Sequence, residues 1–134
     1  MKLNRWLFAA LAIVSLLLAP VAFATDVALT KIVAAPSGAT RTLTAAVNGS
    51  HTVENVPGMM IEIYNASLST RTVTFVTTLT VGPDSLAVAD LTGTIATTVT
   101  KVFGPFSPQL YGPTLTFSLD SETSVSVAAI QLPQ

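Results

Sequence analysis

Hydrophobic and polar residues follow two different patterns along this chain of 134 residues, and the change comes after residue 24. Residues 6–18 form a predominantly apolar run that is preceded by the basic residues Lys2 and Arg5. Farther along, apolar residues alternate with polar ones, most often threonine, and short segments rich in Gly, Pro, Asn or Asp interrupt the alternation. Alternation with a period of two predicts strands that bury one face.

The first 24 residues have the layout of a secretory signal peptide. The basic end and the apolar run are followed by Pro20 and the triplet Ala22-Phe23-Ala24, a small-x-small pattern that signal peptidase cleaves. We predict cleavage between Ala24 and Thr25, which leaves one domain over residues 25–134. Because residues 6–24 are just long enough to span a bilayer, a retained leader acting as an anchor is the alternative. After cleavage we expect no stable membrane span.

Short strands with turn signals between them recur about every ten residues after the leader. They are predicted over residues 27–33, 42–47, 51–56, 59–64, 71–79, 86–91, 92–103, 114–119 and 125–132, with the 92–103 segment divided near Gly93 or Ala96. Asn48-Gly49 predicts a hairpin turn, and the two prolines of residues 104–108 predict a stiff loop. Seven to nine short strands indicate an all-β chain: a single antiparallel β-sandwich, jelly-roll or immunoglobulin-like, with a small barrel as the alternative.

The alternation also predicts which side chains enter the core. The inward positions are Met59, Ile61, Ile63, Val73, Phe75, Leu79, Leu115, Phe117 and Leu119. Phe75 and Phe117 are the largest of these, so we expect both to be buried.

Composition narrows the classes of function. Residues 25–134 contain thirty Ser or Thr residues, which suit a half-solvated sheet face, and four basic against seven acidic residues, a formal charge of −3. Without a basic patch we expect no nucleic-acid partner. The chain has no cysteine, so no disulfide can form and stability must come from sheet packing or from neighbouring subunits.

The residues with reactive side chains form no catalytic pattern. His51 is the only histidine and has no nucleophile motif beside it, so we expect it to be solvated next to a turn. One His and no Cys argue against zinc. The acidic pairs Asp84/Asp90 and Asp120/Glu122 lack the ligand spacing of an EF-type calcium loop, so we expect turn-stabilising or solvated carboxylates, with weak Ca²⁺ binding left open. We predict no catalytic, cofactor-binding or metal-binding residue, no cofactor and no enzymatic activity.

Two Asn-x-Ser sequons begin at Asn48 and Asn65. Glycosylation of either depends on a host that modifies exported proteins. Because Asn and Gly are common turn residues, we expect both asparagines to serve turns instead.

Several segments, in the same order, resemble small structural proteins of tailed phages, of the kind that decorate the head. They are Met-Ile-Glu-Ile-Tyr-Asn-Ala-Ser at 60–67, Arg-Thr-Val-Thr-Phe at 71–75, Leu-Ala-Val-Ala-Asp-Leu-Thr at 86–92, Val-Phe-Gly-Pro-Phe-Ser-Pro-Gln-Leu-Tyr at 102–111 and Ser-Val-Ser-Val-Ala-Ala-Ile at 124–130. The similarity covers residues 27–132 and implies a virion structural role without catalytic residues. The leader departs from this family, whose members normally carry no secretion signal.

Together these features predict a non-enzymatic, exported structural subunit that associates with itself or with a larger protein lattice, on a capsid, a cell surface or an extracellular layer. Its location would be periplasmic, cell-surface or extracellular, or the virion if the resemblance extends to function. The alternative is an exported module that binds a carbohydrate or another small ligand. Few aromatic residues remain for a ligand face in that case.

Overall fold

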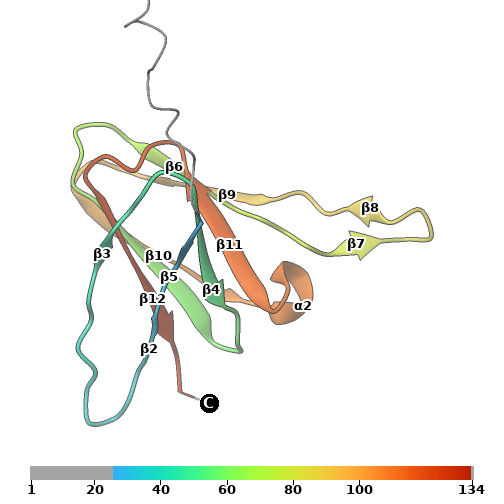
Figure 1. Cartoon of the computed structure of the whole chain (residues 1–134), viewed down its shortest axis with the longest axis horizontal. Coiled ribbons are helices and arrows are strands. Elements are labelled where there is room, and N and C mark those ends of the chain that lie inside the picture. Colours follow the sequence, from blue (N-terminus) through green and yellow to red (C-terminus); the bar gives the residue numbers. More distant parts are fainter. Residues whose placement is uncertain (1–25, 134) are drawn as a thin grey trace, which may run out of the picture.

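Strands form half of residues 26–133, the part of the chain that the computed structural model describes (Figure 1). This part contains β1 (Val27–Ala28), β2 (Lys31–Val33), β3 (Thr44–Ala45), β4 (Ser50–Glu54), β5 (Met59–Asn65), β6 (Arg71–Phe75), β7 (Thr80–Val81), β8 (Leu86–Ala87), β9 (Leu91–Ile95), β10 (Val99–Phe106), the helical turn α2 (Pro108–Tyr111), β11 (Thr114–Leu119) and β12 (Val125–Gln131). The all-β prediction is confirmed. The predicted signal peptide, residues 1–24, and its cleavage site lie outside the described residues.

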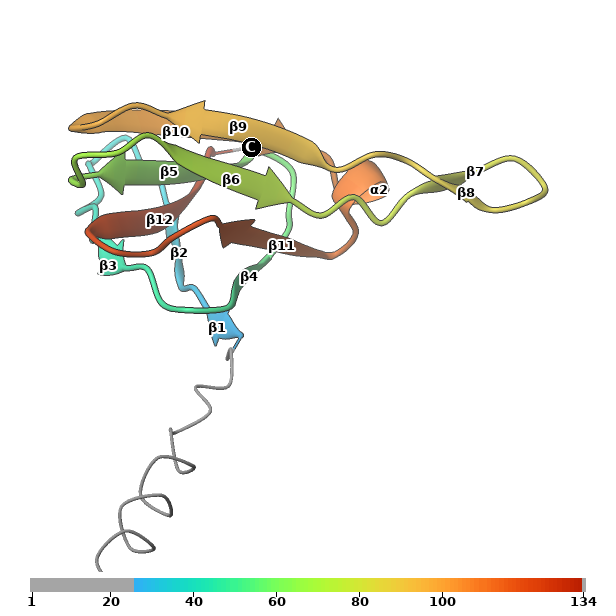
Figure 2. The ribbon, with the colours of Figure 1, turned by 90° about the horizontal axis from the view of Figure 1, so that it is seen from above.

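The strands form two larger sheets and one small ribbon. The first sheet has the order β1-β4-β11-β6-β9, and the second has the order β10-β5-β12-β2. On β12, β3 pairs with residues 126–127, and β2 pairs with residues 129–131. β7 and β8 pair with each other. In Figure 2, β9, β6 and β11 of the first sheet lie beside β10, β5 and β12 of the second.

Both sheets are mixed, which corrects the prediction of a purely antiparallel architecture. β1 runs parallel to β4, and β2 runs parallel to β12. The predicted strand 27–33 is therefore two strands in different sheets. The chain crosses between the sheets after β1, where the Leu29 N–H still donates to the Thr52 carbonyl at 2.7 Å. Alternation identifies the buried face of a strand but does not identify its neighbour.

Strands of both larger sheets contribute buried side chains to a hydrophobic core. It is formed by Val53, Met59, Ile61, Ile63, Val73, Phe75, Ile95, Phe106, Tyr111, Leu115, Phe117, Leu119, Val125, Val127 and Ala129. Phe75 lies at its centre, because its ring centroid is 4.6 Å from that of Phe106, 5.3 Å from that of Phe103 and 5.5 Å from that of Phe117. The predicted burial of Phe75 and Phe117 is confirmed.

Two local predictions are wrong. Residues 48–49 do turn the chain, but β3 joins β12 whereas β4 joins β11, so the turn does not close a hairpin. Residues 104–108 do not form a separate loop, because β10 continues to Phe106, which faces Met59 after a register shift. Pro105 fits there since β10 is an edge strand, where a missing N–H costs little. Gly104 has φ +117°, and a Cβ there would lie 2.8 Å from the Met59 carbonyl oxygen.

The outer face of the first sheet is almost entirely hydroxylated. Strand parity places Ser50, Thr52, Thr72, Thr74, Thr92, Thr94, Thr114, Thr116 and Ser118 on it. Ser50, Ser118, Thr74 and Thr92 lie in one row across four strands. Threonine therefore occupies the solvated side of a half-buried sheet, which is the role that its abundance predicts.

Candidate interaction surfaces

A two-stranded arm projects from the body between β6 and β9 (Figures 1 and 2). Its outer part is the β7–β8 ribbon, in which Thr80 lies opposite Ala87 and Val81 opposite Leu86. Residues 82–85 close the ribbon, and the Ser85 N–H donates to the Gly82 carbonyl. Apolar side chains are exposed along the arm, and Leu86 is 63% exposed. We call residues 79–88 the arm.

The base of the arm is fixed to the body. The backbone N–H groups of Thr78 and Leu79 donate to the Leu110 carbonyl in α2, at 3.1 and 3.2 Å. The Asp90 carboxylate accepts a hydrogen bond from the Thr77 N–H at 2.8 Å. Because these hydrogen bonds hold its base, the arm has a defined direction, and its tip projects from the body.

The arm corrects the prediction that Leu79 enters the core. β6 ends at Phe75, and the next backbone N–H, that of Val76, donates to the Thr116 carbonyl. From there the chain leaves the body, so Leu79 is exposed on the arm. The sequence does carry a signal for the arm. Gly82-Pro83-Asp84 lies between the short segments Thr80-Val81 and Leu86-Ala87, and turn residues in this position are typical of a hairpin tip as well as of a simple break.

A second open surface is the free edge of β10. This strand pairs with β5 on one side, and no other described strand pairs with it. Most of its residues are exposed, including the apolar Val99 and Val102. We call residues 99–103 the β10 edge. Long exposed edges with apolar side chains are templates for pairing with another chain unless charges or prolines protect them.

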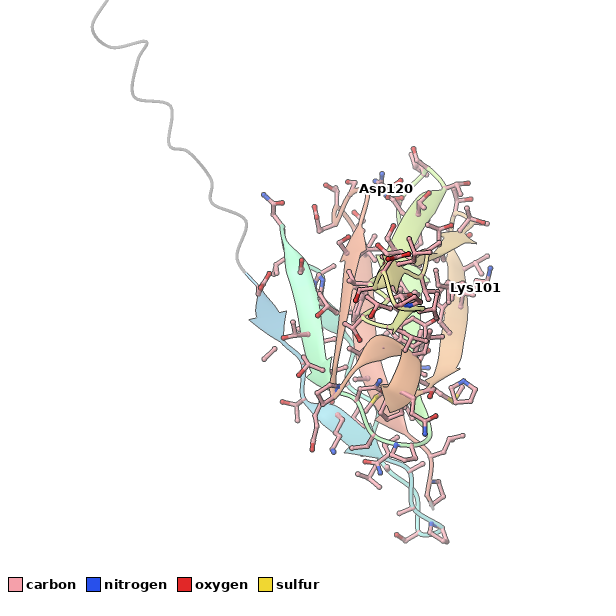
Figure 3. The ribbon with its side chains drawn as sticks, turned by 90° about the vertical axis from the view of Figure 1, so that its right-hand side faces the viewer. Lys101 and Asp120 are labelled. Carbon is pink, nitrogen blue, oxygen red and sulfur yellow. The ribbon has the colours of Figure 1, made fainter. Side chains whose placement is uncertain are left out.

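The one charged side chain on the β10 edge turns toward β9. The Lys101 Nζ donates to the Thr94 carbonyl at 3.0 Å and lies 5.3 Å from the centroid of the Phe103 ring. It therefore caps a carbonyl of β9 and covers Phe103. A Cβ on Gly93 would collide with the same ring, so glycine is required for β9 and β10 to close together here. Figure 3 shows Lys101 at this margin, apart from Asp120 at the end of β11.

His51 lies in the core, which corrects the prediction of a solvated histidine. Its side chain is 0% exposed, and its ring stacks on Phe117 with centroids 5.1 Å apart and planes inclined by 17°. Burial lowers the pKa of His51 below its ordinary value of 6.5, and the Glu122 carboxylate opposes that shift more weakly. The sequence contains a signal for this burial. Alternate residues of a strand share a face, and His51 shares its face with the apolar Val53 on the predicted strand.

The acidic residues of the two predicted pairs lie on the arm, at its base and in the β11–β12 turn. Asp90 caps the Thr77 N–H, as a turn-stabilising carboxylate does, while Asp84 lies at the exposed tip of the arm. Asp120 is exposed and Glu122 is half-buried in the β11–β12 turn. Among residues 26–133, no group of three or more potential metal-ligating side chains is found.

The two sequon asparagines have opposite environments. Asn48 is exposed in its turn. Asn65 is buried, and its Nδ2 donates to the carbonyls of Ser69, Ile95 and Ala96 at 2.8–3.1 Å. Its Oδ1 accepts from both the N–H and the hydroxyl of Ser67. Asn65 thus joins the β5–β6 turn to the end of β9, and its amide is not accessible to a glycosyl group.

Among residues 26–133, two ion pairs join charged side chains of different elements. The Lys31 ammonium lies 2.6 Å from the Glu54 carboxylate, linking β2 to β4. The Arg41 guanidinium lies 2.5 Å from the Glu62 carboxylate, which is buried on the outer side of β5. The loop that carries Arg41 therefore covers part of the outer face of the second sheet, and alternation alone predicts an exposed Glu62.

Comparisons with family models, curated proteins and solved structures gave no match for this chain. Within residues 26–133, no helix is long and apolar enough to cross a membrane.

Proposed function

We propose that the protein is an exported structural subunit whose domain, a single β-sandwich, assembles with further copies of itself head to tail. The observation that carries the proposal is the arm, because it directs apolar side chains away from the body. A two-stranded ribbon is marginally stable in water on its own. Val81 and Leu86 are exposed on it, and packing against another molecule would shield them.

The β10 edge supplies the second half of the contact. It offers unpaired backbone groups beside the exposed side chains of Val99 and Val102. The arm and this edge are different surfaces on different parts of the same molecule. A contact between unlike surfaces repeats from copy to copy and builds an open array, unless its rotation closes a ring. This is the geometry that a lattice or a filament needs.

The sequence adds two further elements to the proposal. The leader supports export, and it predicts a mature N-terminus at Thr25, which N-terminal sequencing of the exported protein would read directly. Retention of Met1 on exported protein would indicate an anchor instead. The collinear resemblance to phage structural proteins supports a lattice role, on a virion or on a cell surface.

Sedimentation velocity over a concentration series tests the assembly. We expect the mean mass of residues 25–134 to rise with concentration, and Leu86→Lys to remove that rise because it places a charge on the arm. Leu68→Lys is the matched control, because Leu68 is 94% exposed in the β5–β6 turn, outside the arm. The mean mass of Leu68→Lys should rise with concentration as that of the wild type does. A wild-type protein that stays monomeric throughout, or Leu86→Lys assembling as the wild type does, would refute the proposal. Saturable glycan binding by such a monomer would favour the carbohydrate module.

A further inference from the structure

His51 connects the body of the protein to a short segment that has few other attachments. The segment comprises residues 44–49, from β3 to the turn before β4. The Val47 N–H donates to the Nε2 atom of His51 at 3.3 Å, and the Ala46 N–H donates to the Val125 carbonyl at 2.9 Å. β3 itself is two exposed residues paired with Ser126 and Val127.

The hydrogen bond fixes the proton on the imidazole ring. Because Nε2 accepts from Val47, the ring hydrogen of the neutral form lies on Nδ1. Nδ1 is buried and has no hydrogen-bond partner. A second proton must therefore go to Nε2, the atom that holds Val47. Protonation both removes this acceptor and places a charge in the buried interior.

Charges around the ring change this cost but do not remove it. Glu122, in the turn between β11 and β12, is the charged group that acts on His51 and favours the imidazolium. The strands that pack on the ring contribute Phe117 and other apolar side chains, which do not titrate. Burial has the larger effect, so the closed protein holds the neutral imidazole.

We propose that His51 is an acid-sensitive latch: its protonation releases residues 44–49 from the body and uncovers the edge of β12 at residues 125–127. Release of the segment would let water reach the ring while the core strands stay paired. The uncovered edge is a pairing surface that the closed protein does not offer. This inference does not rest on the proposed assembly, since it concerns the single molecule.

The direction of the pH dependence follows from proton linkage. The open form binds a proton near the ordinary histidine pKa of 6.5, and the closed form binds it at a lower pH. The latch therefore holds fully above about pH 6.5 and weakens as the pH falls below that value, by up to about tenfold per pH unit.

Hydrogen exchange and NMR on dilute, monomeric protein test the latch. The chain has one histidine, so its imidazole signal is unambiguous. Between about pH 7.5 and about pH 5, we expect protection of the Ala46 and Val47 amides, corrected for intrinsic exchange, to fall by up to about tenfold for each pH unit below about 6.5. Protection of the β11 amides should stay constant. Equal loss in β11, or no loss at Ala46 and Val47, would overturn the proposal.

Two variants separate titration of the latch from a general structural effect. His51→Gln keeps a side-chain acceptor that does not titrate, so its Ala46 and Val47 amides should keep the same protection at both pH values. Glu122→Gln removes the carboxylate that favours the imidazolium in the closed form, so its Ala46 and Val47 amides should lose at least as much protection at about pH 5 as those of the wild type. If His51→Gln does not fold, Glu122→Gln still decides, because higher protection of Ala46 and Val47 at about pH 5 than in the wild type contradicts the electrostatic account.

Discussion

Replacing Phe75 with alanine should lower the free energy of unfolding by about 3–5 kcal/mol, the range that buried Phe→Ala changes produce. Phe75 is completely buried and contacts the rings of Phe103, Phe106 and Phe117, which come from both sheets. Removal of its ring leaves a cavity that closes only if the surrounding rings and strands shift inward. Urea unfolding of the domain, monitored by far-UV circular dichroism, measures the change.

Leu68→Ala is the control for Phe75→Ala, because Leu68 is almost completely exposed. Its free energy of unfolding should stay within about 0.5 kcal/mol of the wild type. Phe117→Ala should resemble Phe75→Ala, since Phe117 is equally buried and supports the ring of His51. A Phe75→Ala variant with the denaturant midpoint of the wild type would contradict the arrangement of the core.

Asn65→Ala should destabilise the domain by about 2–4 kcal/mol, because it leaves buried groups unpaired at about 1–3 kcal/mol each. The Ile95 carbonyl would lose the Nδ2 donor, and the N–H and hydroxyl of Ser67 would lose the Oδ1 acceptor. These bonds lie where β5, β9 and the β5–β6 turn meet. Thermal and urea unfolding measure the loss.

Asn48→Ala provides a control of the same chemistry, since it removes the other sequon asparagine from an exposed position. Its stability should change by no more than about 0.5 kcal/mol. Equal effects of Asn48→Ala and Asn65→Ala would show that the hydrogen bonds of Asn65 do not stabilise the fold.

The strands predicted best are those in which apolar and polar residues alternate strictly. β11 occupies the predicted residues 114–119, and Leu115, Phe117 and Leu119 are buried as expected. The chain also divides after β9 at residues 96–98, near the predicted Ala96. In these segments residue type and strand parity agree, so one observation determines both the element and its buried face.

Strand parity and residue type disagree at His51 and Asn65. Both share a face with apolar neighbours on their strands, yet both are polar and lie beside turns, so residue type favoured an exposed side chain. Burial is possible because each finds partners: Phe117 and Val47 for His51, and the turn carbonyls for Asn65. Phe117 for His51 and Ile95 for Asn65 come from strands distant in sequence, so local sequence does not predict them.

The pairing of strands and the arm depend on long-range arrangement. Residues 27–33 have the pattern of one strand, but they meet the edges of two sheets and divide between them. The β6–β9 connection continues as paired chain beyond the body, so Leu79 follows the parity of Val73 and Phe75 without reaching the core. The alternation of apolar and polar residues along the chain does not indicate where a sheet ends.

A mixing experiment with two interface variants tests head-to-tail assembly most directly. Leu86→Lys disables the arm and Val102→Lys disables the β10 edge, so each variant alone should remain monomeric. Mixed in equal amounts, they combine one intact arm with one intact edge. Sedimentation or native mass spectrometry should then show a 1:1 heterodimer that grows no further. A mixture that stays monomeric, or variants that assemble alone as the wild type does, would contradict the account.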